Sequence, residues 1–344
     1  MAARRMGIVE MASNITAARN HPAEIHRTLQ LAAPVMIGLI ASFGMNFVDT
    51  VMAGRLPEKD IALAALAIGG AVWSAMLMFT IGTLMALQPT VAQLDGEGRK
   101  SAAGAVARQA LWIAVVLAVP FAILMANTGP MLVALAIDSA IIPTAEQYLG
   151  ALSWGAPAIC LVLLMRFFSE GTGHTRPTMY IGLLGVALNV PFNWILMFGK
   201  LGMPALGARG CGYATSVILW LQVLLLLSYL RYHRHFRGFE LFARWDWPKR
   251  KEITELLRIG LPIAVTIFVE GSLFVAEALL IGRLGPVPTA GHLVAINFSA
   301  LVFMIPLGLA SAVTQMKRAA RSFSSCMVCR SLRMLAWSSP CTPA

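Results

Sequence analysis

The sequence contains very little charge. Charged residues make up 12% of its 344 residues, whereas a soluble globular domain usually has about 25%. Hydrophobic residues make up 58%, and the mean hydropathy is +0.73. These values exclude an ordinary soluble domain and predict a polytopic membrane protein. The net charge of +11 does not indicate a nucleic-acid partner, because the basic residues lie between apolar segments.

Cysteine is scarce as well, and catalytic motifs are absent. The sequence has five cysteines, and Cys326 and Cys329 form a pair with no second pair or histidine partner, so we expect no metal site there. It has no zinc-protease His-Glu-x-x-His, no phosphate-binding loop and no Gly-x-Ser-x-Gly turn. We therefore expect no enzyme activity and no cofactor. Residues 1–28 carry four arginines without an apolar core, so we expect no cleavable signal peptide.

Long apolar segments dominate the rest of the chain and predict an all-α bundle of about eight membrane spans. They are Leu31–Gly54, Ile61–Val91, Ala105–Ala126, Tyr148–Phe168, Tyr180–Phe198, Gly212–Leu230, Ile259–Ile281 and Leu293–Val313. A further apolar stretch, Met131–Ile142, is too short to span and carries Asp138, so we interpret it as an interfacial piece.

The distribution of positive charge supports eight spans with a cytoplasmic N-terminus. In that topology 22 of the 27 Lys and Arg residues face the cytoplasm, as the positive-inside rule requires. Counting Met131–Ile142 as a span would place 17 of them outside. We therefore expect a multi-pass protein of the bacterial inner membrane, in contact with the lipid bilayer.

A basic linker over residues 231–258 divides the chain. His233 and His235 lie within it and are interpreted as solvated loop residues. A shift of 228 residues aligns Pro34 with Pro262 and Asp49 with Glu277, which suggests two duplicated halves. We therefore expect a six-helix lobe over residues 1–230 and the first two helices of a second lobe over residues 259–314. The composition changes abruptly at residue 315, and residues 315–344 look like an unrelated, frame-shifted tail.

Asp49 is the only charged residue in the first apolar segment. It lies about 10 Å outward of the membrane midplane if the span is centred near residue 42. A carboxylate at this depth is costly, so it indicates function by default. Asp49 is therefore a candidate to exchange a proton or bind a cation. The alternative is that it reaches the headgroups or pairs with a neighbouring residue.

Asn189 and Asn193 form a second polar feature, in the fifth apolar segment. They are four residues apart, so their amides share one helix face. Pro191 lies between them and cannot donate to the carbonyl of Ala187, which leaves a free acceptor and favours a kink. Carboxylate and amide oxygens suit a hard cation such as Na⁺. The alternative is that the amides only join neighbouring helices.

Two acids in the seventh segment form a third feature. Glu270 and Glu277 are seven residues apart and lie on roughly one face. A buried pair would share a proton. Glu277 has a simpler interpretation, in which it approaches outer water or pairs with Arg283.

The chain resembles the multidrug and toxic compound extrusion (MATE) transporters, in their NorM-type bacterial branch. The stretches that carry the resemblance are Phe47–Gly54, Met85–Pro89 with Val91–Leu94, Leu188–Trp194, Gly210–Thr215 and Asn297–Ser299. The resemblance implies twelve helices in two lobes that export cationic, amphipathic compounds in exchange for Na⁺ or H⁺.

The resemblance also implies roles for individual residues. It places the acid of the first lobe on Asp49, its polar companions on Asn189 and Asn193, and a hydroxyl of the sixth helix on Thr215. It places the seventh-helix acid on Glu270, with Glu277 and Asn297 as possible additional members.

The last four helices of the family have no counterpart in the sequence, so we expect this chain to be inactive alone. A lipid-linked flippase of a related superfamily and a non-transporting membrane remnant are the alternatives.

Overall fold

The computed structural model describes residues 44–241, 246–300 and 302. The chain divides into two compact units, one over Ala41–Ser299 and one made of Met1–Ile40 with Ala300–Ala344. The second unit lies almost wholly outside the described residues, as do three of the five cysteines. All the long helices of the described residues belong to the first unit.

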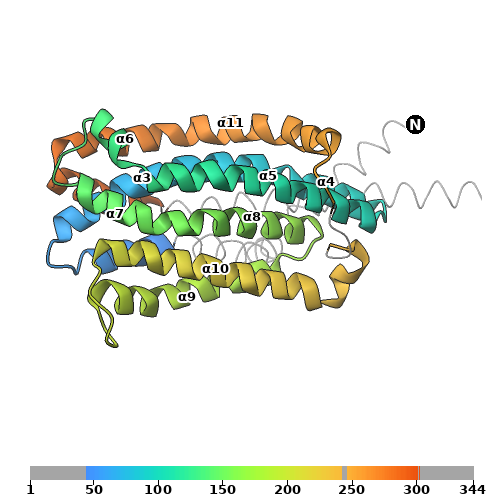
Figure 1. Cartoon of the computed structure of the whole chain (residues 1–344), viewed down its shortest axis with the longest axis horizontal. Coiled ribbons are helices and arrows are strands. Elements are labelled where there is room, and N and C mark those ends of the chain that lie inside the picture. The colour runs from blue at the N-terminus through green and yellow to red at the C-terminus, as the bar shows by residue number, and fades with distance from the viewer. Residues whose placement is uncertain (1–43, 242–245, 301, 303–344) are drawn as a thin grey trace, which may run out of the picture. The chain divides into compact units, whose positions relative to one another are not determined.

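The described residues fold into helices joined by short turns, with no strand among them, so the expected all-α class is confirmed. Figure 1 shows the long helices of the first unit lying side by side along a common direction. In chain order the unit consists of a helix over residues 44–53, α3 (Lys59–Met85), α4 (Leu87–Gly96), α5 (Lys100–Ala126), α6 (Gly129–Ala134), α7 (Ile142–Leu152), η1 (Ser153–Gly155), α8 (Ala156–Gly171), α9 (Arg176–Phe198), α10 (Ala208–Tyr232), η2 (Arg234–Phe239), α11 (Arg250–Ile281), η3 (Gly282–Leu284) and a helix over residues 286–300.

Six stretches of the described residues are long and apolar enough to cross a membrane. They are Lys59–Gly96, Lys100–Ala126, Ile142–Gly171, Arg176–Phe198, Ala208–Tyr232 and Arg250–Leu284. They correspond to the second to seventh expected spans, whereas the first and eighth extend beyond the described residues. The stretch expected to be interfacial contains only the six-residue helix α6, followed by a turn.

Prolines interrupt the spans locally. The second span was expected to be one helix over Ile61–Val91, but α3 ends at Met85 and α4 begins at Leu87. Pro89 explains the break, because it has no N–H to donate to the carbonyl of Met85, four residues earlier. Pro191 is instead retained inside α9, as the sequence predicted.

Small residues let the helices approach closely. A Cβ atom built on Gly82 of α3 would lie 2.3 Å from the Cα of Ala264 in α11. A Cβ on Gly212 of α10 would lie 2.6 Å from the carbonyl oxygen of Tyr148 in α7. Glycine and alanine are the usual residues at such crossings in membrane bundles. These contacts fix α11 along α3 and α10 along α7.

The basic linker is docked on the bundle rather than solvated throughout. Gln109 of α5 is fully buried, donates to the carbonyl of Trp247 at 3.1 Å and accepts from the backbone N–H of Lys249 at 2.7 Å. Arg108 forms an ion pair with Asp246 at 2.6 Å. Residues 246–249 of the linker are thereby held on α5, directly before α11 begins at Arg250.

The interpretation of both linker histidines as solvated was only half right. His233 is exposed, but His235 is half-buried and its ring stacks on that of His174, with 3.8 Å between the ring centroids. The buried Phe236 and Phe239 on the same turn draw His235 inward, because their apolar rings pack against Phe168 of α8.

Candidate cation site

Three polar side chains come together in the interior of the bundle. Asp49, on the helix over residues 44–53, is 6% exposed, and Asn189 and Asn193 of α9 are fully buried. The spacing of four residues in α9 aligns the two amides, as the sequence predicted. Close packing brings the two helices together, since a Cβ on Gly44 would lie only 3.3 Å from Cγ1 of Val186.

One amide links the three side chains. Nδ2 of Asn193 donates to Oδ1 of Asp49 at 2.6 Å and to Oδ1 of Asn189 at 2.8 Å. Thr215 of α10 donates its hydroxyl to Oδ2 of Asp49 at 3.5 Å, a long contact at the limit of a hydrogen bond. The structure therefore joins the four residues Asp49, Asn189, Asn193 and Thr215, which we call the Asp49 cluster.

Two buried atoms of the cluster have no hydrogen-bond partner among the described residues, namely Nδ2 of Asn189 and Oδ1 of Asn193. No basic side chain among those residues pairs with Asp49. An ionised carboxylate buried without a positive partner is strongly destabilising. The cluster therefore suits a carboxyl that is either protonated or compensated by a bound cation.

Two further residues border the cluster and were missed from the sequence. The thiol of Cys211 in α10 lies within interaction range of the Asp49 carboxyl, and so does the phenol of Tyr148 in α7. Both side chains are buried. Cys211 precedes Thr215 by four residues, so the spacing that places both on one face of α10 was the available signal. Tyr148 carried no comparable signal, because only the packing of α7 on α10 brings it here.

Asn297 does not join the Asp49 cluster directly. It lies on the helix over residues 286–300, and its Nδ2 donates to Oγ1 of Thr50 at 2.8 Å. The hydroxyl of Thr50 in turn donates to the carbonyl of Asn46 at 2.9 Å. Asn297 therefore contacts the residue next to Asp49.

The two acids of α11 are not brought to the cluster. Glu270 and Glu277 are both on the exposed face of α11. Glu277 lies 3.9 Å from Nδ1 of His292, and its side chain is exposed, so of the two simple interpretations the pairing with Arg283 is not found. Arg283 instead donates to the carbonyl of Leu135 at 3.0 Å, because η3 turns its side chain toward the turn after α6.

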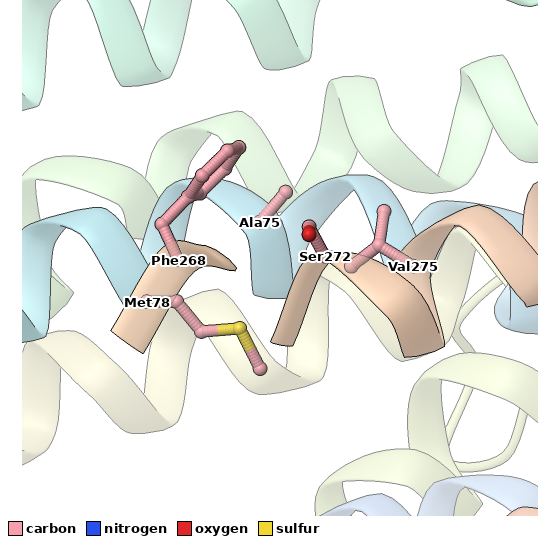
Figure 2. A pocket seen from close by; sticks show the side chains of 5 residues that line it. All are labelled: Ala75, Met78, Phe268, Ser272 and Val275. Carbon is pink, nitrogen blue, oxygen red and sulfur yellow. The ribbon is translucent and has the colours of Figure 1, made fainter. Parts of the chain in front are cut away.

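A small apolar hollow lies between α3 and α11 (Figure 2). Its lining shares no residue with the Asp49 cluster and consists of Ala75, Met78, Phe268, Ser272 and Val275. The hydroxyl of Ser272 is already bonded to the carbonyl of Val269 at 2.7 Å, so the hollow offers little polar chemistry.

The family follows from a comparison with known proteins. The sequence pattern of the MatE family matches residues 34–195 and 262–317, which is more than half of the chain. The chain belongs to the MatE family. The matched residues include Asp49, Asn189, Asn193 and Asn297, and so contain most of the polar contacts described above.

Two curated relatives give the closeness of the match within the MatE family. The chain is 43% identical to the multidrug resistance protein NorM of Aliivibrio fischeri over 85% of its own length and 63% of that protein. It is 42% identical to the multidrug resistance protein PmpM of Pseudomonas aeruginosa, over 85% of its own length and 61% of that protein. The chain thus spans less than two thirds of these relatives.

A solved structure supports the fold. An inward-facing multidrug resistance MATE family transporter of the MOP superfamily superposes with a TM-score of 0.72 at 21% identity, covering 82% of this chain and 63% of that one. Together with the six apolar helices, the likeness establishes a polytopic membrane bundle.

Proposed function

We propose that the chain forms the cation-binding part of an exporter that exchanges Na⁺ or H⁺ for cationic, amphipathic compounds. The observation that carries the proposal is the burial of Asp49 among amides and a hydroxyl, with no basic partner among the described residues. A carboxyl in this setting needs a proton or a cation to offset the cost of its charge.

The Asp49 cluster suits alternation between two states. As described, Asn193 turns its Nδ2 toward the oxygens of both Asp49 and Asn189. Rotating this one amide would instead direct its unpartnered Oδ1 toward them. Three oxygens facing one another repel, unless a cation lies between them. The oxygen set of carboxylate, amide and hydroxyl is the one that hard cations prefer. We infer that Asn193 donates to Asp49 without a cation and coordinates the cation when one binds.

The proposed substrate class of this chain rests on its sequence similarity to known proteins. The two relatives named above are multidrug resistance proteins, and our chain shares 42–43% of the aligned residues with them. We propose that this chain also handles drugs and, as the family resemblance implies, that these are small and cationic. Because the relatives extend well beyond the matched part, we also propose that the 344-residue chain inserts in the membrane but exports nothing alone.

Drug accumulation in a pump-deficient host tests export. The host would express the chain alone or the chain whose residues from 315 onward are replaced by the C-terminal part of the NorM relative. We expect efflux from the fusion and none from the chain alone. Equal efflux from both would contradict the proposed inactivity, whereas no efflux from a correctly inserted fusion would contradict the exporter proposal.

Cation binding tests the site itself. Purified chain in nanodiscs would be titrated with radioactive Na⁺, with choline as the balancing cation, at pH 6 and pH 8. We expect saturable binding that protons displace. Asp49→Asn keeps the size of the side chain and removes its charge, so it should abolish the saturable binding of Na⁺ and with it the displacement by protons. Saturable, proton-sensitive binding by this variant would contradict the assignment.

We further propose that the chain lies in the bacterial inner membrane with its N-terminus and basic linker in the cytoplasm. Leu201 and Arg234 are both exposed and lie beyond opposite ends of the span α10, so they should face opposite sides of the membrane. Single cysteines at these positions, with the three tail cysteines replaced by serine, test the orientation. An impermeant thiol reagent added to intact cells should label position 201 and not 234, and the reverse pattern would refute the topology.

A further inference from the structure

Adjacent residues of one helix contact two different parts of the bundle. Asp49 contacts Asn193 of α9 and Thr215 of α10, whereas Thr50 accepts a hydrogen bond from Asn297 of the helix over residues 286–300. Neighbouring residues on a helix are about 100° apart around its axis, so one turn can face both partners. This turn joins the Asp49 cluster to the helix that follows α11.

The contact at Thr50 has a defined polarity. Nδ2 of Asn297 donates to Oγ1 of Thr50, and the hydroxyl of Thr50 donates to the carbonyl of Asn46, one turn back on its own helix. Thr50 is buried and Asn297 is half-buried. The single hydroxyl hydrogen of Thr50 is therefore used by the carbonyl of Asn46, and its oxygen is left to accept from Asn297.

The contact is also sensitive to rotation of the helix. Turning a helix by roughly 20° moves an atom about 5 Å from its axis by about 1.7 Å. A shift of this size directed along the bond takes the donor–acceptor distance of 2.8 Å well past the 3.5 Å at which a hydrogen bond is lost. A modest rotation that carries Thr50 directly away from Asn297 is thus enough to break the bond.

We propose that the Thr50–Asn297 hydrogen bond transmits cation occupancy at Asp49 to the helix over residues 286–300. Thr50 and Asn297 are positioning residues in this scheme and do not touch the cation. The inference rests on the proposed function, because it requires a cation at Asp49. A cation that draws Asp49 toward α9 and α10 rotates the helix over residues 44–53. The bond from Asn297 to Thr50 is then lost, which releases the helix over residues 286–300.

The expected shift in the helix equilibrium follows from the free energy of the Thr50–Asn297 hydrogen bond. Interhelical hydrogen bonds in membranes are weak on average, so removing one should change the equilibrium between the two helix arrangements about threefold. The effect on Na⁺ affinity should not exceed the same factor, because the Asp49 cluster itself is intact. A variant that damaged the structure would instead lower both the Na⁺ affinity and the stability of the fold.

Spin-label distance measurements on the whole 344-residue chain in nanodiscs test the proposal. Labels at Leu184 of α9 and Val294 of the helix over residues 286–300 would report on the two parts, since both side chains are exposed. The three tail cysteines would be replaced by serine, and Cys160 and Cys211 retained, because neither has exposed surface. Na⁺ binding would be measured on the same samples.

We expect Na⁺ to shift the distance distribution of the parent. Thr50→Ser keeps the hydroxyl, so its distribution should shift in the same way. Thr50→Val and Asn297→Leu should bind Na⁺ within about threefold of the parent while the distribution no longer responds. A Thr50→Val variant that binds Na⁺ and responds as the parent does overturns the inference alone. Failure of the parent to bind either Na⁺ or protons overturns the proposed function, and the inference with it.

Discussion

Asn193 and Asp49, 144 positions apart in the chain, are joined by a hydrogen bond of 2.6 Å between Nδ2 and Oδ1. The same amide bonds Asn189 at 2.8 Å, so a single side chain organises the whole cluster. Asn193 is fully buried, and its carbonyl oxygen is left without a partner among the described residues. The residue that holds the carboxyl is thus also the one with an unused oxygen for a cation.

The first prediction concerns Asn193. Replacing it with Ala removes both hydrogen bonds and the unused oxygen, and we expect the Na⁺ affinity of the chain in nanodiscs to fall at least tenfold, which is about 1.4 kcal/mol. Asn127→Ala is the matched control, because Asn127 is exposed and its side chain donates within its own helix, to the carbonyl of Ile123 four residues back. If both variants bound Na⁺ within a factor of two of the parent, Asn193 would not be a ligand.

The second prediction concerns pH and the linker. Burial lowers the pKa of His235 below its ordinary value, and the neighbouring His174 and Lys100 lower it further, against a small opposing effect of Asp95. Below the ordinary value of about 6.5, the unfolded linker then binds more protons than the docked one. Docking should therefore be fully stable above pH 6.5 and weaken as the pH falls toward the lowered pKa.

Limited proteolysis of the linker at pH 7.5 and pH 5.5 measures this effect. Cleavage should be faster at pH 5.5 in the parent chain. His235→Phe retains an aromatic ring against His174 and cannot titrate, so its cleavage rate should depend much less on pH. His292→Phe, on the helix over residues 286–300, is the control for a histidine outside the linker. A pH dependence that survives unchanged in His235→Phe would refute the assignment, whereas His292→Phe should keep the pH dependence of the parent.

The third prediction concerns Gln109. Gln109→Leu keeps the approximate size of the side chain and leaves the carbonyl of Trp247 and the N–H of Lys249 without their partner. Losing these two hydrogen bonds, which lie at the edge of the bundle, should cost about 1 kcal/mol, so we expect a lower thermal midpoint and faster proteolysis of the linker. The control is Gln93→Leu, because Gln93 is exposed and bonds only Glu97 at 3.3 Å. Equal stability of the two variants would exclude Gln109 as the anchor of the linker.

The sequence predicted much of this arrangement, because the signals were local. An acid in an apolar segment drew attention to Asp49, and a spacing of four residues placed Asn189 and Asn193 on one face. Six expected spans recur as helices with shifted ends. The break at Ala86 was not predicted, because the apolar run continues on both sides of it. Pro89 is the residue that causes the break.

What the sequence could not predict depends on contacts between distant segments. Thr215 was assigned from the family resemblance and not from its own segment. The role of Thr50 as the acceptor from Asn297 spans 247 positions, and no local pattern encodes it. Glu277 lies 3.9 Å from His292, and Arg283 donates to the carbonyl of Leu135 instead, because the chain turns at η3. The stacking of His235 on His174 likewise depends on how the linker folds back onto α8.

The last prediction concerns the crossing of α3 and α11. Gly82 makes one of the close backbone contacts there, since a Cβ atom at this position would lie 2.3 Å from the Cα and 2.6 Å from the backbone nitrogen of Ala264. Backbone atoms cannot turn aside as a flexible side chain can, so Gly82→Ala must push the two helices apart. Overpacking of this kind typically costs about 1–3 kcal/mol.

Gly70→Ala is the matched control, because it lies on the same helix and its added Cβ would meet nothing within 4 Å. In a membrane helix this change should be neutral or slightly stabilising, since alanine favours the helix by about 1 kcal/mol. Thermal unfolding in detergent should therefore show a lower midpoint for Gly82→Ala only. Because α11 packs chiefly along α3, its separation should also expose the α3–α11 hollow around Met78 and Phe268 to lipid. Parent-like midpoints for both variants would mean that the helices do not cross as closely as described.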